Sequence, residues 1–130
     1  MIARAVVAVA LVVLALTACG PQLPSFDELS MVSFMRGLTV ESADDLYVQD
    51  DPQLVAAFAA LLTEHGVDTS TYETPSEEEC PQGVTFRVEG AFGDTGYGFG
   101  MGIRDCGDSG DSFEAQAVDM LTGWLVELTR

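Results

Sequence analysis

The sequence of 130 residues contains no lysine and no asparagine, and all of its basic residues are arginines. Five arginines face 21 acidic residues, which gives a formal net charge of −16 at pH 7. A protein that binds nucleic acid needs cationic side chains to neutralise phosphates, and docking on anionic lipids needs them too. The composition therefore argues against a nucleic-acid partner. The acidic surface is explained most simply by solubility, and the alternative is that it binds a cationic partner or divalent ions.

Histidine and cysteine are also scarce, which limits metal and nucleophile chemistry. His65 is the only histidine, and the three cysteines include no C-x-x-C pair, so a zinc site with four Cys or His ligands is not expected. Asp105, Asp108 and Asp111 are three residues apart, whereas an EF-hand loop spaces its acidic ligands by two. We therefore expect no metal, no cofactor and no catalytic residue, and we assign His65 to the last turn of a helix.

The longest apolar run lies at the N-terminus. Arg4 is the only charged residue before Asp27, and residues 5–16 are all Ala, Val or Leu. Residues 5–19 as a helix would measure about 22 Å at ~1.5 Å per residue, which is short of the ~30 Å core of a bilayer. A short cationic start, an apolar core and small residues after it are typical of a secretory signal.

The end of this run reads Leu16-Thr17-Ala18-Cys19, which resembles the lipobox of bacterial lipoproteins. The resemblance covers residues 1–20 only. It implies cleavage before Cys19, a diacylglycerol on the Cys19 thiol and further acylation, with palmitate for example, at the new N-terminus. It therefore implies a signal peptide at 1–18, a lipid-anchored tether at 19–24, a domain at 25–130, and a place on the extracytoplasmic face of the cell membrane. Stable anchoring by two or more acyl chains is consistent with this.

With Cys19 lipidated, Cys80 and Cys106 remain as a pair. Outside the cytoplasm such a pair forms a disulfide by default. The bridge would close a loop of about 27 residues and contribute roughly 3.5 kcal/mol in the chain-entropy model. Two alternating runs, 84–92 and 97–103, lie between these cysteines and are separated by the turn "GDTG", so we predict a β-hairpin stapled at its open end.

The patterns in the rest of the sequence predict mostly helices. Ser25 and Glu28 have the spacing of a capping box before an apolar run, so we predict a helix over residues 25–36. Residues 38–48 are ambiguous. Asp51-Pro52 predicts the start of a helix that ends at Gly66. Residues 68–83 are predicted to form a loop. Residues 113–129 are predicted to form a helix that covers the hairpin. The expected fold is a small single α+β domain, an antiparallel sheet packed against about three helices.

The second hairpin strand has glycine at 98, 100 and 102, and Gly96 precedes it in the turn. This period of two differs from the G-x-G-x-x-G nucleotide loop, and a P-loop lysine is missing. A strand with one bare face fits either a close approach by another group or pairing with a strand from a partner.

These patterns favour a non-catalytic lipoprotein that binds an envelope protein or scaffolds an assembly. Two alternatives stay open. One is a carrier of a small or lipidic ligand in a cavity between helices and sheet, and the other is a hydrolase that uses paired carboxylates.

Overall fold

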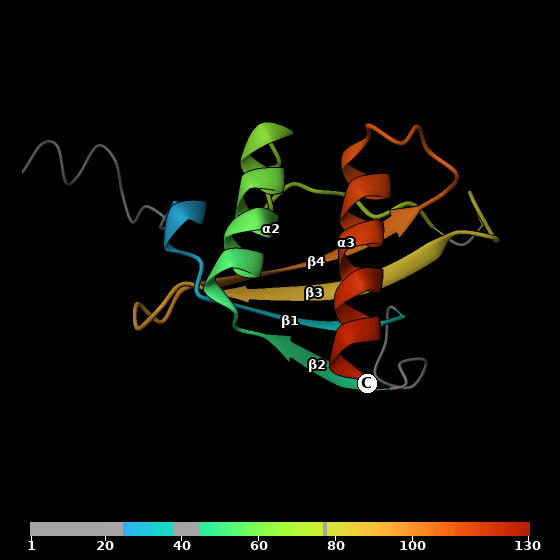
Figure 1. The fold of residues 1–130 in the computed structure, drawn as a ribbon. Helices are drawn as coiled ribbons and strands as arrows, with labels where there is room; N and C mark the ends of the chain where they lie inside the picture. The colour runs from blue at the N-terminus through green and yellow to red at the C-terminus, as the bar shows by residue number, and fades with distance from the viewer. Residues whose placement is uncertain (1–24, 38–44, 77) are drawn as a thin grey trace, which may run out of the picture.

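The computed structural model describes residues 25–37, 45–76 and 78–130 as a two-layer α+β domain (Figure 1). The elements in chain order are the 3-10 helix η1 (Phe26–Glu28), β1 (Met31–Arg36), β2 (Leu46–Gln49), α2 (Pro52–Glu64), β3 (Val84–Ala91), β4 (Gly98–Asp105) and α3 (Phe113–Leu128). The predicted α+β class and antiparallel sheet are confirmed. Within the described residues two α-helices and one short 3-10 helix replace the three helices expected.

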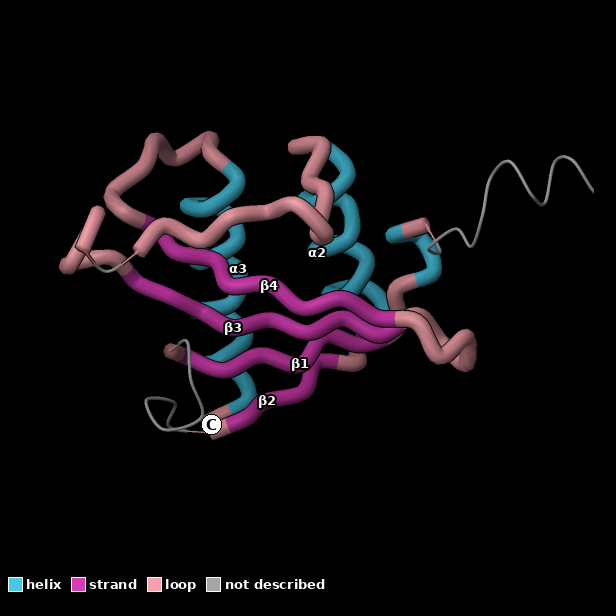
Figure 2. The backbone as a smooth tube through the Cα atoms, turned by 180° about the vertical axis from the view of Figure 1, so that it is seen from behind, coloured by secondary structure: helices cyan, strands magenta, loops and turns pink. Residues whose placement is uncertain are grey.

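The four strands form one antiparallel sheet in the order β2-β1-β3-β4. Both helices lie on one face, and the view from behind shows the strands in front of them (Figure 2). The predicted hairpin is β3–β4, paired from Val84↔Asp105 to Ala91↔Gly98. Helix α3 contacts β4, β3 and β2, which confirms that the last helix covers the hairpin.

The core fills the layer between the helices and the sheet. Trp124 of α3 lies 5.8 Å from Phe34 of β1 and 5.9 Å from Phe58 of α2, measured between ring centroids. This aromatic cluster joins both helices to the central strand. The largest fully buried side chains are Phe34, Phe58, Phe86, Leu62, Ile103, Leu121, Val32, Val55 and Val88.

The helix predicted over residues 25–36 is wrong beyond its first turn. Ser25 caps a single 3-10 turn, in which its Oγ accepts a hydrogen bond from the Asp27 backbone N–H at 3.3 Å, and β1 follows from Met31. In β1, Val32 and Phe34 are fully buried and alternate with more exposed residues, which is the period of a strand. Because β1 pairs with strands on both sides, its backbone hydrogen bonds are satisfied by distant segments rather than by a local helix.

The start of the fold is fixed at one end of the sheet by three phenylalanine rings. Phe26 of η1 lies 6.4 Å from Phe92 and 6.0 Å from Phe99, and these two rings are 5.9 Å apart. Phe92 follows β3 and Phe99 lies in β4, so the rings tie η1 to the closed end of the hairpin. Residue 25, where the tether would join, therefore lies at the hairpin-turn end of the molecule.

Candidate functional site

The structure joins Cys80 and Cys106 in a disulfide, with their Cα atoms 5.6 Å apart. Cys106 follows the last residue of β4, and Cys80 lies just before β3. The bridge therefore closes the open end of the hairpin beyond the Val84↔Asp105 pair, as the sequence predicted. Both cysteines are only partly buried, beside a surface depression of about 330 Å³ lined by Cys80, Pro81, Gln82, Gly83, Cys106 and Gly107.

Arg104 lies beside this disulfide and is only 4% exposed. Its Nε donates to the Cys80 carbonyl and to Cys80 Sγ, both at 3.1 Å, and its terminal nitrogens donate to the Cys80 carbonyl and to Thr85 Oγ1. Gly83 makes room for it, because a Cβ there would lie 2.7 Å from Arg104 Nε. Sequence reasoning missed Arg104. The only signal in the sequence was that Arg104 comes two residues before Cys106, at the end of a predicted strand.

The glycine pattern of β4 has a structural explanation. A Cβ on Gly98 would lie 2.6 Å from the Gly90 carbonyl oxygen, and one on Gly100 would lie 2.6 Å from the Arg87 guanidinium. At Gly102 the backbone carbonyl accepts a hydrogen bond of 2.6 Å from Thr74 Oγ1, so the loop before β3 reaches the outer edge of β4 (Figure 2). The bare face of this strand is thus occupied by close neighbours at Gly98 and Gly100, and its edge is contacted by Thr74 at Gly102.

The sheet face away from the helices carries apolar side chains on β1 and β2. Met31 is 37% exposed, Leu46 62% and Val48 45%. Val48 pairs with Ser33, and Leu46 pairs with Met35, so these side chains share the face opposite the half-buried Tyr47 and the buried Gln49. Helices cover only the other face among the described residues, which leaves this half of the sheet accessible.

His65 lies at the C-cap of α2, as predicted. Its ring packs 5.9 Å from Phe113, and Tyr72 packs 5.7 Å from the same ring. The Tyr72 hydroxyl is buried near the Glu114 carboxylate, but it makes no well-formed hydrogen bond within the described part of the chain. Burial raises the pKa of Tyr72, and the negative charge of Glu114 raises that pKa further, so this phenol stays protonated at neutral pH.

The acidic residues of the β4–α3 loop accept hydrogen bonds from within the same loop. Asp105 Oδ1 accepts hydrogen bonds from the backbone N–H groups of Gly107 and Asp108, at 3.0 and 3.1 Å. A hydrogen bond from Ser109 lowers the pKa of the Asp111 carboxyl, as the bond from Ser70 lowers that of Asp68. Both carboxylates are therefore ionised at neutral pH. Within residues 25–37, 45–76 and 78–130, no group of three or more His, Cys, Asp or Glu side chains could hold a metal ion.

A second depression, of about 380 Å³, lies between η1 and α2. Its apolar lining comes from Phe26, Leu29, Pro52, Ala56 and Ala59, and Asp27 and Ser30 add polar groups. It lies at the end of the molecule where the described chain begins. It lies at the edge of the core, because Leu29 and Ala59 line it and also belong to the buried core cluster.

The lipobox and Cys19 lie outside the described residues, so Cys19 lipidation stays a prediction. None of the helices in the described part is long and apolar enough to cross a membrane. Comparison with known proteins yields no matching family model, no matching curated protein and no matching solved structure.

Proposed function

We propose that the protein is a cell-envelope lipoprotein, anchored through lipid on Cys19, whose domain binds another protein without catalysing a reaction. The observation that carries the binding proposal is the exposed apolar set Met31, Leu46 and Val48 on the sheet face that the helices leave uncovered. Neighbouring exposed apolar side chains on a flat sheet are a feature of protein-binding surfaces.

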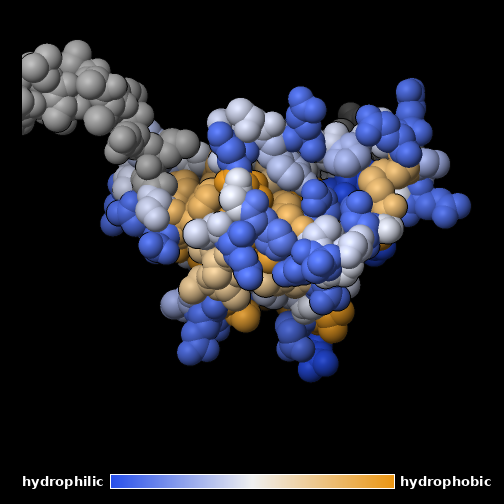
Figure 3. Space-filling view, turned by 90° about the horizontal axis from the view of Figure 1, so that it is seen from above, coloured by the Kyte–Doolittle hydropathy of each residue, from blue (hydrophilic) through white to orange (hydrophobic). Residues whose placement is uncertain are grey.

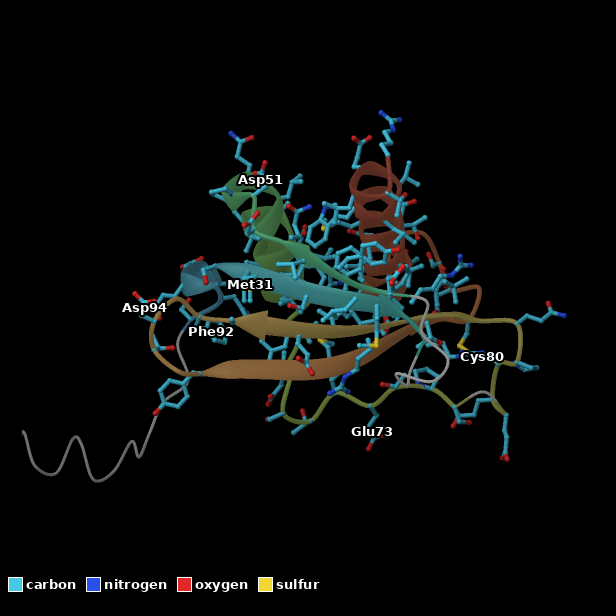
Figure 4. The ribbon with its side chains drawn as sticks, turned by 90° about the horizontal axis from the view of Figure 1, so that it is seen from below. Met31, Asp51, Glu73, Cys80, Phe92 and Asp94 are labelled. Atoms are coloured by element: carbon cyan, nitrogen blue, oxygen red, sulfur yellow. A yellow bond between two sulfur atoms is a disulfide. The ribbon has the colours of Figure 1, made fainter. Side chains whose placement is uncertain are left out.

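The anchor would orient this surface. A tether over residues 20–24 reaches at most ~17 Å when fully extended, and it enters at the η1 end of the fold. Met31, Asp51, Phe92 and Asp94 lie toward this end, and Cys80 lies toward the other (Figure 4). The sheet separates the two ends by about 27 Å, the length of an eight-residue strand. Leu46 pairs with Met35 near the distal end, where a protein in the envelope can reach it.

The charge of the domain points to a partner with a basic rim. Asp45 precedes Leu46, Asp50 and Asp51 follow β2, and Glu89 lies on the same uncovered face, across β1 from Val48. Another side of the molecule, seen from above, shows hydrophilic side chains around apolar ones (Figure 3). An apolar centre with acidic flanks fits a partner with an apolar centre and Lys or Arg around it, and such a pair associates faster at low salt.

The test is site-specific photo-crosslinking in native membranes. A photoreactive residue at position 48 is compared with one at position 126. Val48 and Val126 have similar exposures of 45% and 49%, but Val48 lies in the sheet and Val126 in helix α3. We expect one defined adduct from position 48, with a yield that falls at high salt and in a Leu46→Asp background. Position 126 should give no adduct.

Equal labelling from both positions would contradict the proposed surface. An adduct of twice the chain's own mass would show that the occupant is a second copy rather than a basic partner. Cys19 is tested separately by mass spectrometry of the N-terminal peptide, where an unmodified Cys19 or an intact Met1 start would rule out the anchor.

The depression between η1 and α2 supports a second candidate, a carrier of a small apolar ligand. Its volume of about 380 Å³ lies at the lower end of ligand pockets. Native mass spectrometry of the protein and of an Ala56→Trp variant, which fills the depression, distinguishes the two functions. A ligand mass present in the first and absent in the second would favour the carrier. Its absence from both would remove this candidate.

A further inference from the structure

Arg104 is a buried cation that forms no ion pair with the described residues. At 4% exposure it has no carboxylate within salt-bridge distance in the described residues, and all of its hydrogen-bond acceptors are neutral. A buried charge without a counter-ion is costly, and it favours any change that places a negative charge beside it. The nearest group able to become negative is Cys80 Sγ, which accepts a hydrogen bond from Arg104 Nε at 3.1 Å.

We propose that Cys80 and Cys106 form a redox-active pair that exchanges with an external dithiol, and that Arg104 stabilises Cys80 as a thiolate in the reduced protein. This site is separate from the proposed binding surface, and it rests on the proposed function only for the location outside the cytoplasm. The substrate class is a dithiol, either a small molecule or a pair of cysteines on another extracytoplasmic protein.

The proposal follows from comparing the two redox states. In the disulfide, Sγ of Cys80 is neutral and offers Arg104 only a weak acceptor. After reduction, a Cys80 thiolate would form a charge-assisted hydrogen bond with the guanidinium, which is stronger than a bond between neutral groups. A cation next to a cysteine lowers the pKa of the thiol. Because this gain exists only in the reduced state, it makes the disulfide easier to reduce.

The reaction balances with the dithiol as the reductant. A thiolate of the external dithiol attacks Cys106 Sγ, and the Cys80–Cys106 bond breaks with its electron pair going to Cys80, which leaves as the thiolate beside Arg104. The second thiol of the reductant then attacks the mixed disulfide as a thiolate. Cys106 is released and takes up a proton, the external dithiol is oxidised by two electrons to its disulfide, and one proton passes to solvent.

The surroundings permit this exchange without loss of the fold. Cys80 and Cys106 both line the depression of about 330 Å³ and are only partly buried, so the bridge lies at the surface of the domain. The hairpin keeps its register from Val84 to Ala91, and Arg104 still holds the Cys80 carbonyl, so opening the bridge frees Cys106 locally. In thiol–disulfide exchange the sulfur whose thiol has the lower pKa is the better leaving group, and the proposal assigns this role to Cys80 beside Arg104.

The test measures the thiol pKa of each cysteine in the full-length, membrane-extracted protein after mild reduction. Alkylation rates are followed against pH by mass spectrometry. Cleavage after Arg36, Arg87 and Arg104 places Cys19, Cys80 and Cys106 on separate peptides, because the chain has no lysine. The redox equilibrium is measured in parallel against a dithiothreitol buffer at pH 7.

We expect the Cys80 thiol to titrate at least one pH unit below the ~8.5 of an ordinary cysteine, and Cys106 to titrate above Cys80. Arg104→Gln should raise the Cys80 value by one unit or more and make the disulfide at least tenfold harder to reduce, a shift of ~30 mV. Arg104→Lys should restore part of both effects. Arg87→Gln is the matched control, since Arg87 lies over Gly100, and it should change neither.

A purely structural Arg104 would give a different result. Arg104→Gln would then lower stability and leave the pKa of Cys80 and the redox equilibrium unchanged, which overturns the proposal. If Arg104→Gln does not fold, the unsubstituted protein still decides the question. A Cys80 thiol that titrates at 8.5 or above, or no lower than Cys106, refutes thiolate stabilisation by Arg104.

Discussion

Gly90 provides a sharp test of how β3, β4 and η1 pack together. It lies at a buried position of β3, opposite Phe99, and the Phe99 ring covers it. A Cβ at Gly90 would lie 2.6 Å from Phe99 Cζ and 2.9 Å from Leu29 Cδ1, much closer than van der Waals contact. Gly90→Ala therefore forces the Phe99 ring to move, and that ring also contacts Phe26 of η1.

The magnitude follows from two opposing effects. Overpacking of a filled core costs about 1–3 kcal/mol, and replacing glycine by alanine recovers about 0.4–1 kcal/mol by restricting the unfolded chain. We expect Gly90→Ala to lower the free energy of unfolding by about 1–2 kcal/mol. For a domain of this size each kcal/mol lowers the melting temperature by roughly 4–8 °C.

Urea unfolding followed by tryptophan fluorescence measures this change, because the single Trp124 lies in the core. The matched control is Gly123→Ala. Gly123 is exposed on α3 and a Cβ there meets nothing within 4 Å, so this variant should gain up to ~1 kcal/mol of stability from helix propensity. A double variant with Phe99→Ala should remove most of the Gly90→Ala penalty. If Gly90→Ala is neutral or stabilising, the packing described here is refuted.

Three further predictions concern other parts of the fold. Tyr72→Phe should raise stability at pH 7 by up to ~1 kcal/mol, because it removes a buried hydroxyl that makes no well-formed hydrogen bond within the described residues. The fold raises the pKa of Tyr72, so the protonated phenol is favoured in the folded protein. Its effect on the free energy of unfolding is therefore fully present below the unfolded pKa of ~10 and is lost as the pH rises above that value. Urea titrations between pH 8 and 11 should therefore show an alkaline loss of stability that is smaller in this variant, and equal loss in both proteins contradicts the assignment. Asp51→Ala should lower the free energy of unfolding in urea by about 1 kcal/mol, because Asp51 Oδ1 accepts hydrogen bonds from the Gln53 and Leu54 backbone N–H groups at 2.9 and 3.4 Å. Asp50→Ala, one residue earlier, is the control and should cost less than half as much. Trp124→Ala should cost about 3–5 kcal/mol in thermal unfolding followed by circular dichroism, and a cost below 1 kcal/mol contradicts its place in the core.

Local sequence signals were reliable where an element is determined by its own residues. Asp51-Pro52 marked the start of α2, Ser112 caps α3 through its Oγ to the Ala115 N–H, and alternation marked β3. The prediction failed for β1. Its apolar residues fit a helix nearly as well as a strand, and a capping signal preceded them, so nothing local could show that β2 and β3 would pair on either side.

The disulfide and its surroundings divide in the same way. Cysteine count and the alternating runs between Cys80 and Cys106 were enough to predict the bridge, because a hairpin brings its two ends together. Arg104 could not be assigned from sequence. Its burial and its contact with Cys80 Sγ depend on the loop before β3, the absence of a side chain at Gly83 and the hydroxyl of Thr85 on the neighbouring strand.

The sequence by itself determined the charge, the resemblance to a lipoprotein signal at residues 1–20, both α-helices and the hairpin, since each depends on composition or on short-range periodicity. The tertiary structure alone decided that β1 is a central strand, that a buried guanidinium adjoins the disulfide, and that the described helices leave the β1–β2 half of one sheet face uncovered, with Leu46 and Val48 exposed on it. The physical reason is that strand pairing, burial and side-chain hydrogen bonds join residues far apart in the chain, and their free energies exceed the local preferences that a sequence displays.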